Sequence, residues 1–405
     1  MPEICRCNCK IDKSAALVAK CGGLRYIDAG MAKRYQIGAY YFPNYHADPR
    51  NEARYGKGWT EWELLKRASP RFPHHQQPKV PAWGYEDESD PAVFARKIDA
   101  AADHGLTQFI FDWYWHEEGM FLNRALDEGY LQAANRERLQ FSLMWANHDW
   151  VELFPQRRVL RDRAVLLNRG AVSPQVFEQI TDHIIARYFS QPTYWKIDGR
   201  PYFSIYELFR LVESFGSIDE TRKALQRFRE KVKSAGHPDL HLNAVVWGIQ
   251  LLPGERNVSH PREMLHALGF DSTTTYAWVH HVRLDQFPFT PYERVMEKSA
   301  AYWHKPETEF GLPYFPNVSM GWDSTPRTAQ SDVHDEGAYP FTAVMSGNTP
   351  AAFHAALESV KDFLDARNQA IFNINAWNEW TEGSYLEPDT ASGMAYLEAI
   401  RDVFN

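Results

Sequence analysis

The sequence lacks the features that mark several classes of protein. Its few cysteines all lie among the first 21 of the 405 residues, so no disulfide framework can hold the main fold. No apolar run approaches the roughly 20 residues of a membrane-spanning helix. Basic residues form no block, and the net charge is −8. These absences argue against a disulfide-rich domain, a membrane-spanning chain and a nucleic-acid-binding protein.

The N-terminus, which holds Cys5, Cys7, Cys9 and Cys21, is expected to be an extension of the main domain. Zinc sites usually use Cys-x2-4-Cys pairs with a matching second pair, and neither is present, so a flexible tail with free thiols is favoured over a metal site. The same stretch has no continuous apolar core like that of a secretory signal, and a cytoplasmic location is therefore expected. We predict an extension over residues 1–33 and a single catalytic domain over residues 34–405.

Eight apolar segments of strand type recur along the chain. They cover residues 35–42, 107–115, 139–147, 200–207, 240–248, 270–278, 313–322 and 369–377. Helical patterns separate most of them; residues 91–105, for example, begin with Pro and end with Gly. Such alternation predicts an α/β protein with a closed (β/α)8 TIM barrel and long βα loops, chiefly residues 44–90 and 321–348. A doubly wound open sheet is the alternative, but the Gly-rich turn expected after its first strand is missing.

Aromatic and hydrogen-bonding residues gather where the predicted strands end. In a barrel, the catalytic groups come from these carboxyl ends. Indole and phenol faces suit the apolar faces of sugar rings, while amides, imidazoles and carboxylates bind ring hydroxyls. We therefore predict a carbohydrate cleft in which Trp113, Trp115, Trp145 and Trp278 lie together with Glu379. The substrate-binding candidates are Tyr41, Trp59, Asp112, Trp113, Trp115, Trp145, Asn147, His148, Tyr206, Trp278, Trp322, Asp323, Trp377 and Asn378.

Two carboxylates follow the last predicted strand in the stretch "NAWNEWTEGSYLEPD". Glu379 and Glu382 are three residues apart, a spacing that lets both side chains reach one cleft from a helical or tight turn. Sugar transfer needs such an acid and base pair. The flanking indoles are expected to lower the local dielectric and raise one carboxyl pKa. Glu387 and Asp389 are assigned to a solvated acidic loop.

The same stretch resembles the terminal signature of the glycoside hydrolase family 99-like, WbsX-type domains. The blocks "IGAYYFPNYHAD", "GWTEWELLKRASPRFPHHQQPKVPAWGY", "FIFDWYWH", "FSLMWANHDW" and "GWDSTPR" agree with that family in the same order. The resemblance implies a (β/α)8 glycosidase-type fold. In the family 99 endo-α-mannosidases both acids lie in Glu-Trp-x-Glu, and the substrate's 2-hydroxyl forms a 1,2-anhydro sugar with overall retention. By this likeness Glu379 is the base and Glu382 the acid, although Thr381 stands where those enzymes typically carry His.

Three functions compete on these grounds. The first is a retaining glycoside hydrolase acting on a polysaccharide or oligosaccharide, with an α-mannoside-like substrate. The second is a glycosyltransferase of O-antigen-type polysaccharide synthesis, and the third is a non-catalytic carbohydrate-binding barrel. The paired acids favour the hydrolase, which is expected to need no metal and no nucleotide cofactor.

Overall fold

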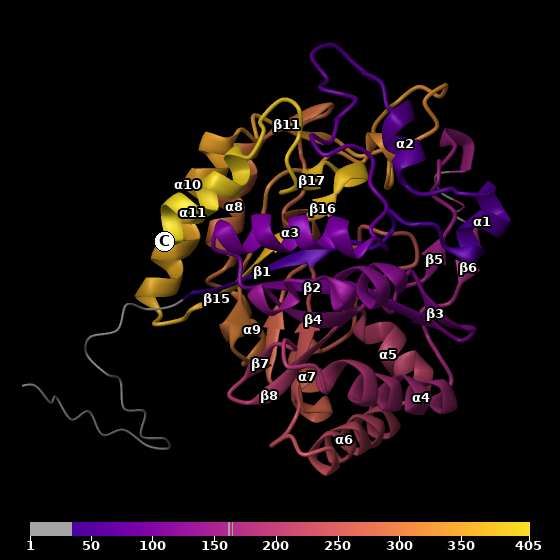
Figure 1. Ribbon diagram of the computed structural model, residues 1–405, viewed down its shortest axis with the longest axis vertical. Coiled ribbons are helices and arrows are strands. Elements are labelled where there is room, and N and C mark those ends of the chain that lie inside the picture. Colours follow the sequence, from indigo (N-terminus) through magenta and orange to yellow (C-terminus); the bar gives the residue numbers. More distant parts are fainter. Residues whose placement is uncertain (1–34, 161–162, 164) are drawn as a thin grey trace, which may run out of the picture. The chain divides into compact units, whose positions relative to one another are not determined.

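The computed structural model describes residues 35–160, 163 and 165–405 (Figure 1). Residues 35–405 form one compact unit. The predicted extension over residues 1–33, with its cysteines, lies outside the described residues.

A parallel sheet forms the centre of this unit and closes into the predicted barrel. Its strands are β1 (Gln36–Tyr41), β2 (Gln108–His116), β4 (Gln140–Trp145), β8 (Arg200–Ile205), β9 (His241–Val245), β10 (Ser272–Thr274), β12 (Tyr314–Phe315), β13 (Asn317–Ser319) and β15 (Ile371–Asn375). Each of the eight predicted segments contains strand residues, and β12 and β13 are two pieces of one segment, divided at Pro316. Since β12 pairs with β10 and β13 pairs with β15, this segment joins the two edges of the sheet. The TIM-barrel prediction is confirmed.

Helices surround the barrel on its outer side (Figure 1). They are α3 (Pro91–Asp103), α4 (Pro174–Ile184), α5 (Leu208–Phe215), α6 (Ile218–Ser234), α7 (Pro261–Leu268), α8 (Tyr292–Tyr302), α9 (Pro306–Phe310), α10 (Pro350–Ala366) and α11 (Ala395–Phe404). The start of α3 shows why the sequence predicts it: the Asp90 side chain accepts a hydrogen bond from the Ala92 N–H at 2.8 Å, and Pro91 occupies the first turn. Phe94 of this helix packs against Phe111 of β2, with ring centroids 6.1 Å apart.

Alternation along the strands divides an apolar outside from a polar inside. On β2, Phe109 and Phe111 face the helices, whereas Gln108 and Asp112 face the barrel interior. Interior side chains hydrogen-bond from strand to strand, as Ser204 of β8 does with Asn243 of β9 at 2.9 Å. The core of the unit therefore lies mainly between the barrel and its helices.

Long βα loops build the end of the barrel that carries the site. The first loop contains α1 (Pro49–Tyr55) and α2 (Trp62–Arg67), and the third contains the strands β5 (Trp150–Val151) and β6 (Leu166–Asn168). The seventh contains the short helix η7 (Thr325–Arg327) and the strand β14 (Val344–Ser346), which pairs with β11 (Phe289–Pro291). After the last barrel strand come β16 (Asn378–Glu379), η8 (Trp380–Glu382) and β17 (Ser384–Tyr385). The smaller elements elsewhere are β3 (Gly119–Phe121), β7 (Lys196–Ile197), η1 (Ala125–Gly129), η2 (Tyr130–Gln132), η3 (Arg136–Arg138), η4 (Arg158–Leu160), η5 (Ile185–Phe189) and η6 (Trp278–His280).

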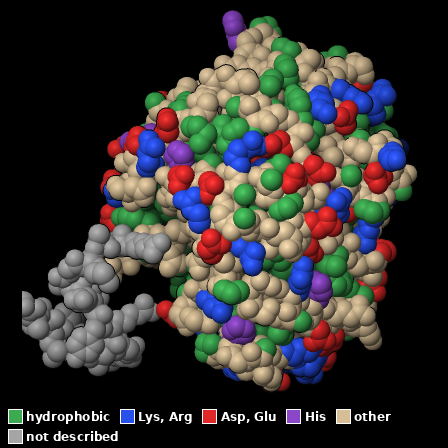
Figure 2. Space-filling view, viewed as in Figure 1, with side chains coloured by type: hydrophobic (Ala, Val, Ile, Leu, Met, Phe, Trp, Pro, Cys, Tyr) green, Lys and Arg blue, Asp and Glu red, His purple; other side chains and the backbone are tan. Residues whose placement is uncertain are grey.

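Acidic and basic side chains alternate over the face shown in Figure 2, without a stripe of one sign. In the part of the chain that the structure describes, no helix is both long and apolar enough to cross a membrane.

Candidate active site

The Glu-Trp-Thr-Glu segment forms a tight turn after the last barrel strand. Glu379 ends β16 and Glu382 ends the 3-10 turn η8, while β16 and β17 pair antiparallel and close the segment into a hairpin. Side chains three residues apart in a 3-10 turn lie one above the other, so both carboxyl groups point to the same side. Both glutamates are buried, with 3% and 4% of their surface exposed.

Close packing behind the turn fixes its shape. Gly383 has a φ of 65°, and a Cβ atom there would lie 2.6 Å from the Cβ atom of Asp323. The Asp323 N–H donates to the Glu382 carbonyl at 2.5 Å. The Asp323 carboxylate hydrogen-bonds with His75 Nε2 at 2.9 Å and accepts from Gln77 Nε2 at 2.7 Å. Burial alone would raise the pKa of Asp323, but these hydrogen bonds outweigh it and lower the pKa to about 2.

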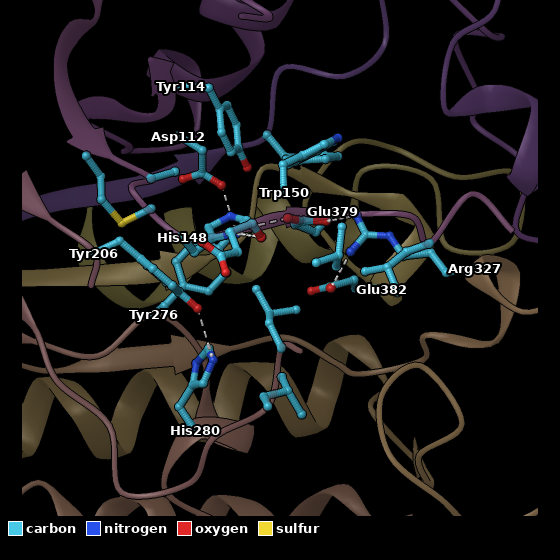
Figure 3. Close-up of a pocket in the computed structure, with 18 of the residues that line it drawn as sticks. Asp112, Tyr114, His148, Trp150, Tyr206, Tyr276, His280, Arg327, Glu379 and Glu382 are labelled. Carbon is cyan, nitrogen blue, oxygen red and sulfur yellow. Dashed lines mark hydrogen bonds and ion pairs between the residues drawn. The ribbon is translucent and has the colours of Figure 1, made fainter. Parts of the chain in front are cut away.

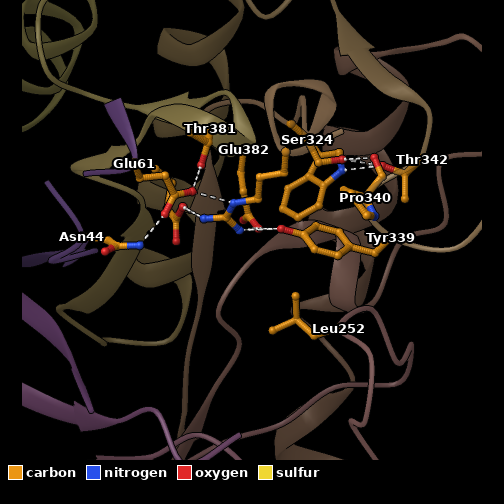
Figure 4. A network of polar contacts seen from close by, with 12 residues as sticks. Asn44, Glu61, Leu252, Ser324, Tyr339, Pro340, Thr342, Thr381 and Glu382 are labelled. Atoms are coloured by element: carbon orange, nitrogen blue, oxygen red, sulfur yellow. Dashed lines mark hydrogen bonds and ion pairs between the residues drawn. The ribbon is translucent and has the colours of Figure 1, made fainter. Parts of the chain in front are cut away.

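The Arg327 guanidinium connects both glutamates to a third, and Figure 4 shows Glu61, Tyr339 and Glu382 converging at this point. Its Nε donates to Glu61 Oε1 at 2.7 Å, its Nη1 to Glu382 Oε1 at 2.5 Å, and its Nη2 to Glu379 Oε2 at 3.3 Å. The Tyr339 hydroxyl also donates to Glu382 Oε1, at 2.5 Å. One buried cation thus faces three carboxyl groups.

The balance of burial and charge raises the pKa of both glutamates. Burial, followed by the charge of Glu382, raises the pKa of Glu379 well above its ordinary range, with Arg327 opposing this. Burial also raises the pKa of Glu382, but Arg327 and the Tyr339 hydroxyl act against it more directly. The two carboxyls therefore titrate as a pair that takes up its first proton at a higher pH than an exposed carboxyl would. In the free protein, this proton is favoured on Glu379.

Both glutamates face a pocket at the carboxyl end of the barrel (Figure 3). The pocket contains about 640 Å³ of empty space, counted out to its solvent-facing mouth. Its aromatic lining consists of Phe42, Tyr114, His148, Trp150, Phe154, Tyr206, Tyr276, His280 and Trp322. Trp150 stacks on Phe154 with ring centroids 5.4 Å apart. The arrangement combines paired carboxyl groups with aromatic platforms in one cavity.

Four predicted substrate-binding residues line this pocket together with Glu379 and Glu382. They are Asp112, His148, Tyr206 and Trp322. Burial lowers the pKa of His148, which favours the neutral imidazole. The Tyr206 hydroxyl donates to Glu255 Oε1 at 2.6 Å. These side chains come from strands two, three, four and seven, as the rule that barrel sites form at strand ends requires.

The predicted cleft of Trp113, Trp115, Trp145 and Trp278 is wrong. Trp113 packs near Tyr188 with ring centroids 6.1 Å apart, Trp115 near His183 at 5.3 Å, Trp145 near Phe177 at 5.8 Å, and Trp278 near Tyr292 at 5.3 Å. All of these partners belong to the surrounding helical layer. The physical reason is strand alternation, because Trp113 and Trp115 follow Phe109 and Phe111 in steps of two and so face outward.

Three further predicted binding residues lie behind the first loop or the strand ends instead of in the pocket. The Tyr41 hydroxyl donates to Glu88 Oε1 at 2.8 Å, on the outer side of β1. Trp59 lies behind the pocket wall, 6.0 Å from the Phe154 ring centroid. The Asn147 side chain donates to the Glu207 carbonyl at 2.9 Å and accepts from its N–H at 2.7 Å, which aligns the ends of β4 and β8.

Asp323, Trp377 and Asn378 also lie outside this pocket and support the turn or its neighbours. Asp323 holds the turn as described above. The Trp377 indole N–H donates to Glu387 Oε1 at 2.9 Å. The Asn378 side chain bonds both backbone groups of Phe42, accepting at 2.8 Å and donating at 2.7 Å, and so positions that ring at the pocket wall.

The acids at the end of the segment are buried, which corrects their assignment to a solvated loop. Glu387 accepts the indole N–H of Trp380 at 2.6 Å in addition to that of Trp377, and pairs with Lys97 Nζ at 2.7 Å. The Asp389 carboxylate accepts the Tyr385 hydroxyl at 2.7 Å. The two indoles therefore support the turn from behind, and they do not surround the carboxyl groups of Glu379 and Glu382.

Several pocket residues were not among the predicted site residues. Arg327 is the most important, and it lies in the block "GWDSTPR" within a long loop. Tyr114 lies on the inward side of β2 near its carboxyl end, Trp150 begins β5 in the third loop, and Tyr276 follows β10. For Tyr114, the two-residue step from Asp112 is a usable sequence signal. For Arg327 there is no local periodicity, and only the quoted block points to it.

A second hollow adjoins the pocket, with Trp322 in the wall of both. It contains about 820 Å³ of empty space, counted to its open side, and is lined by His74, Lys79, Asp323, Asn348 and others. Over the described residues, no three His, Cys, Asp or Glu side chains gather in an arrangement that could hold a metal ion.

Comparison with known proteins identifies the family. The family described as Glycosyltransferase WbsX matches residues 37–400. The chain belongs to this family. Proteins named "Uncharacterized protein WxcX" from two strains of Xanthomonas campestris pv. campestris are 28% identical over 390 residues, which is 90% of this chain and 48% of theirs. The chain thus spans about half the length of these curated relatives.

Solved structures with a fold similar to that of this chain include a glycoside hydrolase. The GH99 endo-α-mannosidase from Bacteroides thetaiotaomicron has a TM-score of 0.52 at 14% identity, with 91% of this chain and 96% of that chain covered. A "Glycoside hydrolase-like protein" has a TM-score of 0.60 at 14% identity, with 95% and 97% covered. At these identities the likeness shows the fold.

Proposed function

We propose that this WbsX-family chain is a glycoside hydrolase acting on a polysaccharide or oligosaccharide. The observation that carries the proposal is the pair of buried carboxyls, Glu379 and Glu382, that face one aromatic-walled pocket at the carboxyl end of the barrel. Burying two like-charged groups side by side is costly to stability, and acid–base chemistry on a sugar is a function that needs such a pair.

The proposed mechanism is retaining and uses the substrate's own 2-hydroxyl. Glu379 takes the proton from this hydroxyl, whose oxygen then attacks the anomeric carbon and forms a 1,2-anhydro sugar. Glu382 donates its proton to the leaving oxygen, and water opens the anhydro ring with the two residues in exchanged roles. The roles and the α-mannoside-like substrate follow from the likeness of the Glu-Trp-x-Glu segment to family 99.

This assignment requires the shared proton to lie on Glu382 when substrate is bound. In the free protein, Arg327 and Tyr339 both contact Glu382, which favours its ionised form. The substrate must therefore change the balance, either by separating Glu382 from these donors or by hydrogen-bonding the anion of Glu379. The experiments must therefore test which glutamate is the acid and which is the base.

A glycosyltransferase is the alternative that the family description favours. The pocket lining, however, offers a single guanidinium, Arg327, which Glu61, Glu379 and Glu382 already engage. A nucleotide diphosphate would have to compete with these carboxyl groups for that cation. A purely carbohydrate-binding barrel would keep the aromatic wall but would have no use for the buried acid pair.

Replacement of each glutamate by Gln tests the proposal. Glu379→Gln and Glu382→Gln keep the size of the side chain but remove its titrating proton, so turnover of a cleaved glycan should fall by about 10² to 10⁴ while binding persists. Glu293→Gln, on the exposed side of α8, is the matched control and should keep full activity. Unchanged turnover in both pocket variants would exclude the pair from the chemistry.

The roles are separated by the leaving group. A dinitrophenyl glycoside needs little protonation, so it should rescue Glu382→Gln far more than Glu379→Gln. Rescue of Glu379→Gln instead would exchange the two roles. NMR of the first released anomer measures retention, and good cleavage of a 2-deoxy substrate would rule out the anhydro sugar.

A further inference from the structure

One phenol hydroxyl at the pocket floor stands between two carboxyl groups (Figure 3). The Tyr276 oxygen lies 2.8 Å from Asp112 Oδ2 and 3.0 Å from Glu379 Oε1. All three side chains are buried, with 7% of Tyr276, 2% of Asp112 and 3% of Glu379 exposed. A phenol has a single proton to donate, so it can satisfy only one of two ionised carboxylates.

If Asp112 and Glu379 were both ionised, Tyr276 could donate its proton to only one of them, and the other carboxylate would lack this hydrogen bond. Arg327 Nη2 reaches Glu379 at 3.3 Å, but within the described part of the chain no Lys, Arg or His side chain contacts Asp112. Asp112 Oδ1 is buried and has no hydrogen-bond partner there. An ionised Asp112 would thus be a buried anion with no cation and, at best, a shared hydrogen bond, which is costly.

The groups packed around Asp112 supply no other positive charge. Tyr40 comes from β1, Tyr114 from β2 itself and Tyr276 from the segment after β10, while Glu382 faces it from η8 and raises its pKa further. Burial is the larger cause of the raised pKa, and the Tyr276 hydrogen bond opposes it. The rings of Tyr206 and His280 lie 5.8 and 6.1 Å from that of Tyr276, and Arg327 is directed at the glutamates.

We propose that Asp112 is a neutral carboxylic acid that donates its proton to the Tyr276 oxygen and so directs the Tyr276 O–H to Glu379. Asp112 is then a positioning residue that acts through Tyr276. This inference rests on the proposed function, in which Glu379 is the base.

The chain of donors has a consequence for the catalytic pair. A neutral Asp112 removes one negative charge from the surroundings of Glu379, and Tyr276 adds a donor beside Arg327. Both changes favour the ionised form of Glu379. The preference of the shared proton for Glu379 is thereby reduced, so that bound substrate has less to change before Glu382 holds the proton.

The protonation state of Asp112 can be read without any substrate. At neutral pH, the infrared difference between the wild-type chain and Asp112→Asn should contain the C=O stretch of a protonated carboxyl group. Asp285→Asn is the control, because Asp285 pairs with Arg294 and Lys298, which lower its pKa, and the difference should contain only carboxylate bands. In Tyr276→Phe the acid band should shift, since its acceptor is lost. Only carboxylate bands in the Asp112→Asn difference would overturn the proposal.

The pH profile of turnover gives a second readout, with dinitrophenyl α-mannoside as the probe. Asn keeps a neutral donor beside Tyr276, so Asp112→Asn should leave the acidic limb of kcat/KM near its wild-type pH. Tyr276→Phe removes the donor to Glu379 and should move that limb to higher pH, by about one unit or tenfold in the proton affinity. A shift to lower pH in Asp112→Asn would mean that a negative charge has been removed, and would contradict a neutral Asp112.

The experiments distinguish a failure of the proposed hydrolase function from a failure of the role proposed for Asp112. A chain that cleaves no glycoside would refute the proposed function and leave the infrared band in place. A chain that cleaves through Glu379 but lacks the band would refute the role of Asp112 alone.

Discussion

At the scale of single residues, Arg327 determines how the site is charged. It is the one buried cation in contact with Glu61, Glu379 and Glu382 among the described side chains. Lysine could not replace it, because only a guanidinium directs several N–H donors to separate carboxyls at once. The site therefore depends on a residue from a long loop as much as on the barrel strands.

Asp323 yields a prediction about pH and stability. Its folded pKa of about 2 lies below the ordinary 3.8, so its contribution is fully present at neutral pH and is lost as the pH falls toward 2. Asp323→Asn should lower the free energy of unfolding by about 2 to 3 kcal/mol at pH 7. Urea unfolding from pH 7 to pH 3 should show this difference shrinking below about pH 4. The exposed Asp402→Asn should show no such trend, and a constant loss at all pH values for Asp323→Asn would contradict the linkage.

The sequence predicted some of the residues that line the pocket and misplaced others. Glu379, Glu382, Asp112, His148, Tyr206 and Trp322 could be chosen from strand ends and motif likeness. Trp113 and Trp145 were misplaced because nearness to a strand end does not decide which face a side chain takes. The step of two from Phe109 to Phe111 to Trp113 contains that information, and combining it with position would have excluded them.

At the scale of elements, helix α3 supports the Glu-Trp-Thr-Glu turn through a buried ion cluster. Lys97 Nζ pairs with Glu88 Oε1 at 2.9 Å and with Glu387 Oε1 at 2.7 Å, and Glu387 accepts both indole N–H groups of the turn. A helix on the outer side of the barrel is in this way connected to the segment that carries Glu379.

Removal of the cation should be strongly destabilising. Lys97→Met would leave Glu88 and Glu387 buried without their partner, so the free energy of unfolding should fall by about 3 to 5 kcal/mol. Lys66→Met is the matched control, because its 2.9 Å pair with Glu63 is partly exposed, and it should change stability by less than about 1 kcal/mol. Urea unfolding at pH 7 measures both. Equal, small effects would show that the cluster does not hold the turn.

At the scale of the whole molecule, the barrel is narrow enough to fix the identity of interior residues. A Cβ atom on Gly38 of β1 would lie 2.8 Å from Ile110 Cδ1 of β2 and 2.9 Å from Asn373 Oδ1 of β15. Three neighbouring strands thus meet at a position where an added methyl group would displace the ends of interior side chains from both adjacent strands.

Gly38→Ala should therefore destabilise the barrel as a unit, by about 1 to 3 kcal/mol. At Gly248 a Cβ atom would meet no neighbour within 4 Å, so Gly248→Ala is the control and should be neutral or slightly stabilising. Thermal unfolding followed by circular dichroism compares the two. A neutral Gly38→Ala would mean that the interior has room to relax.

The barrel itself was the part of the molecule most open to prediction. Its eight strand segments each have a local apolar pattern, and their order with helices between them leaves few topologies. The division of the seventh segment at Pro316 is a consequence of the missing proline N–H at a point where the segment changes neighbours from β10 to β15. Loop residues such as Arg327 and Tyr339 reach the site through tertiary geometry, which no local pattern encodes.

Trp322 separates the pocket of Glu379 and Glu382 from the second hollow and belongs to the wall of both. Its indole N–H donates to Thr342 at 3.0 Å, which fastens the partition to the seventh loop. For protein engineering, this makes Trp322 the position at which the two hollows can be merged. A smaller side chain there would join the two hollows into one longer groove beside Glu379 and Glu382.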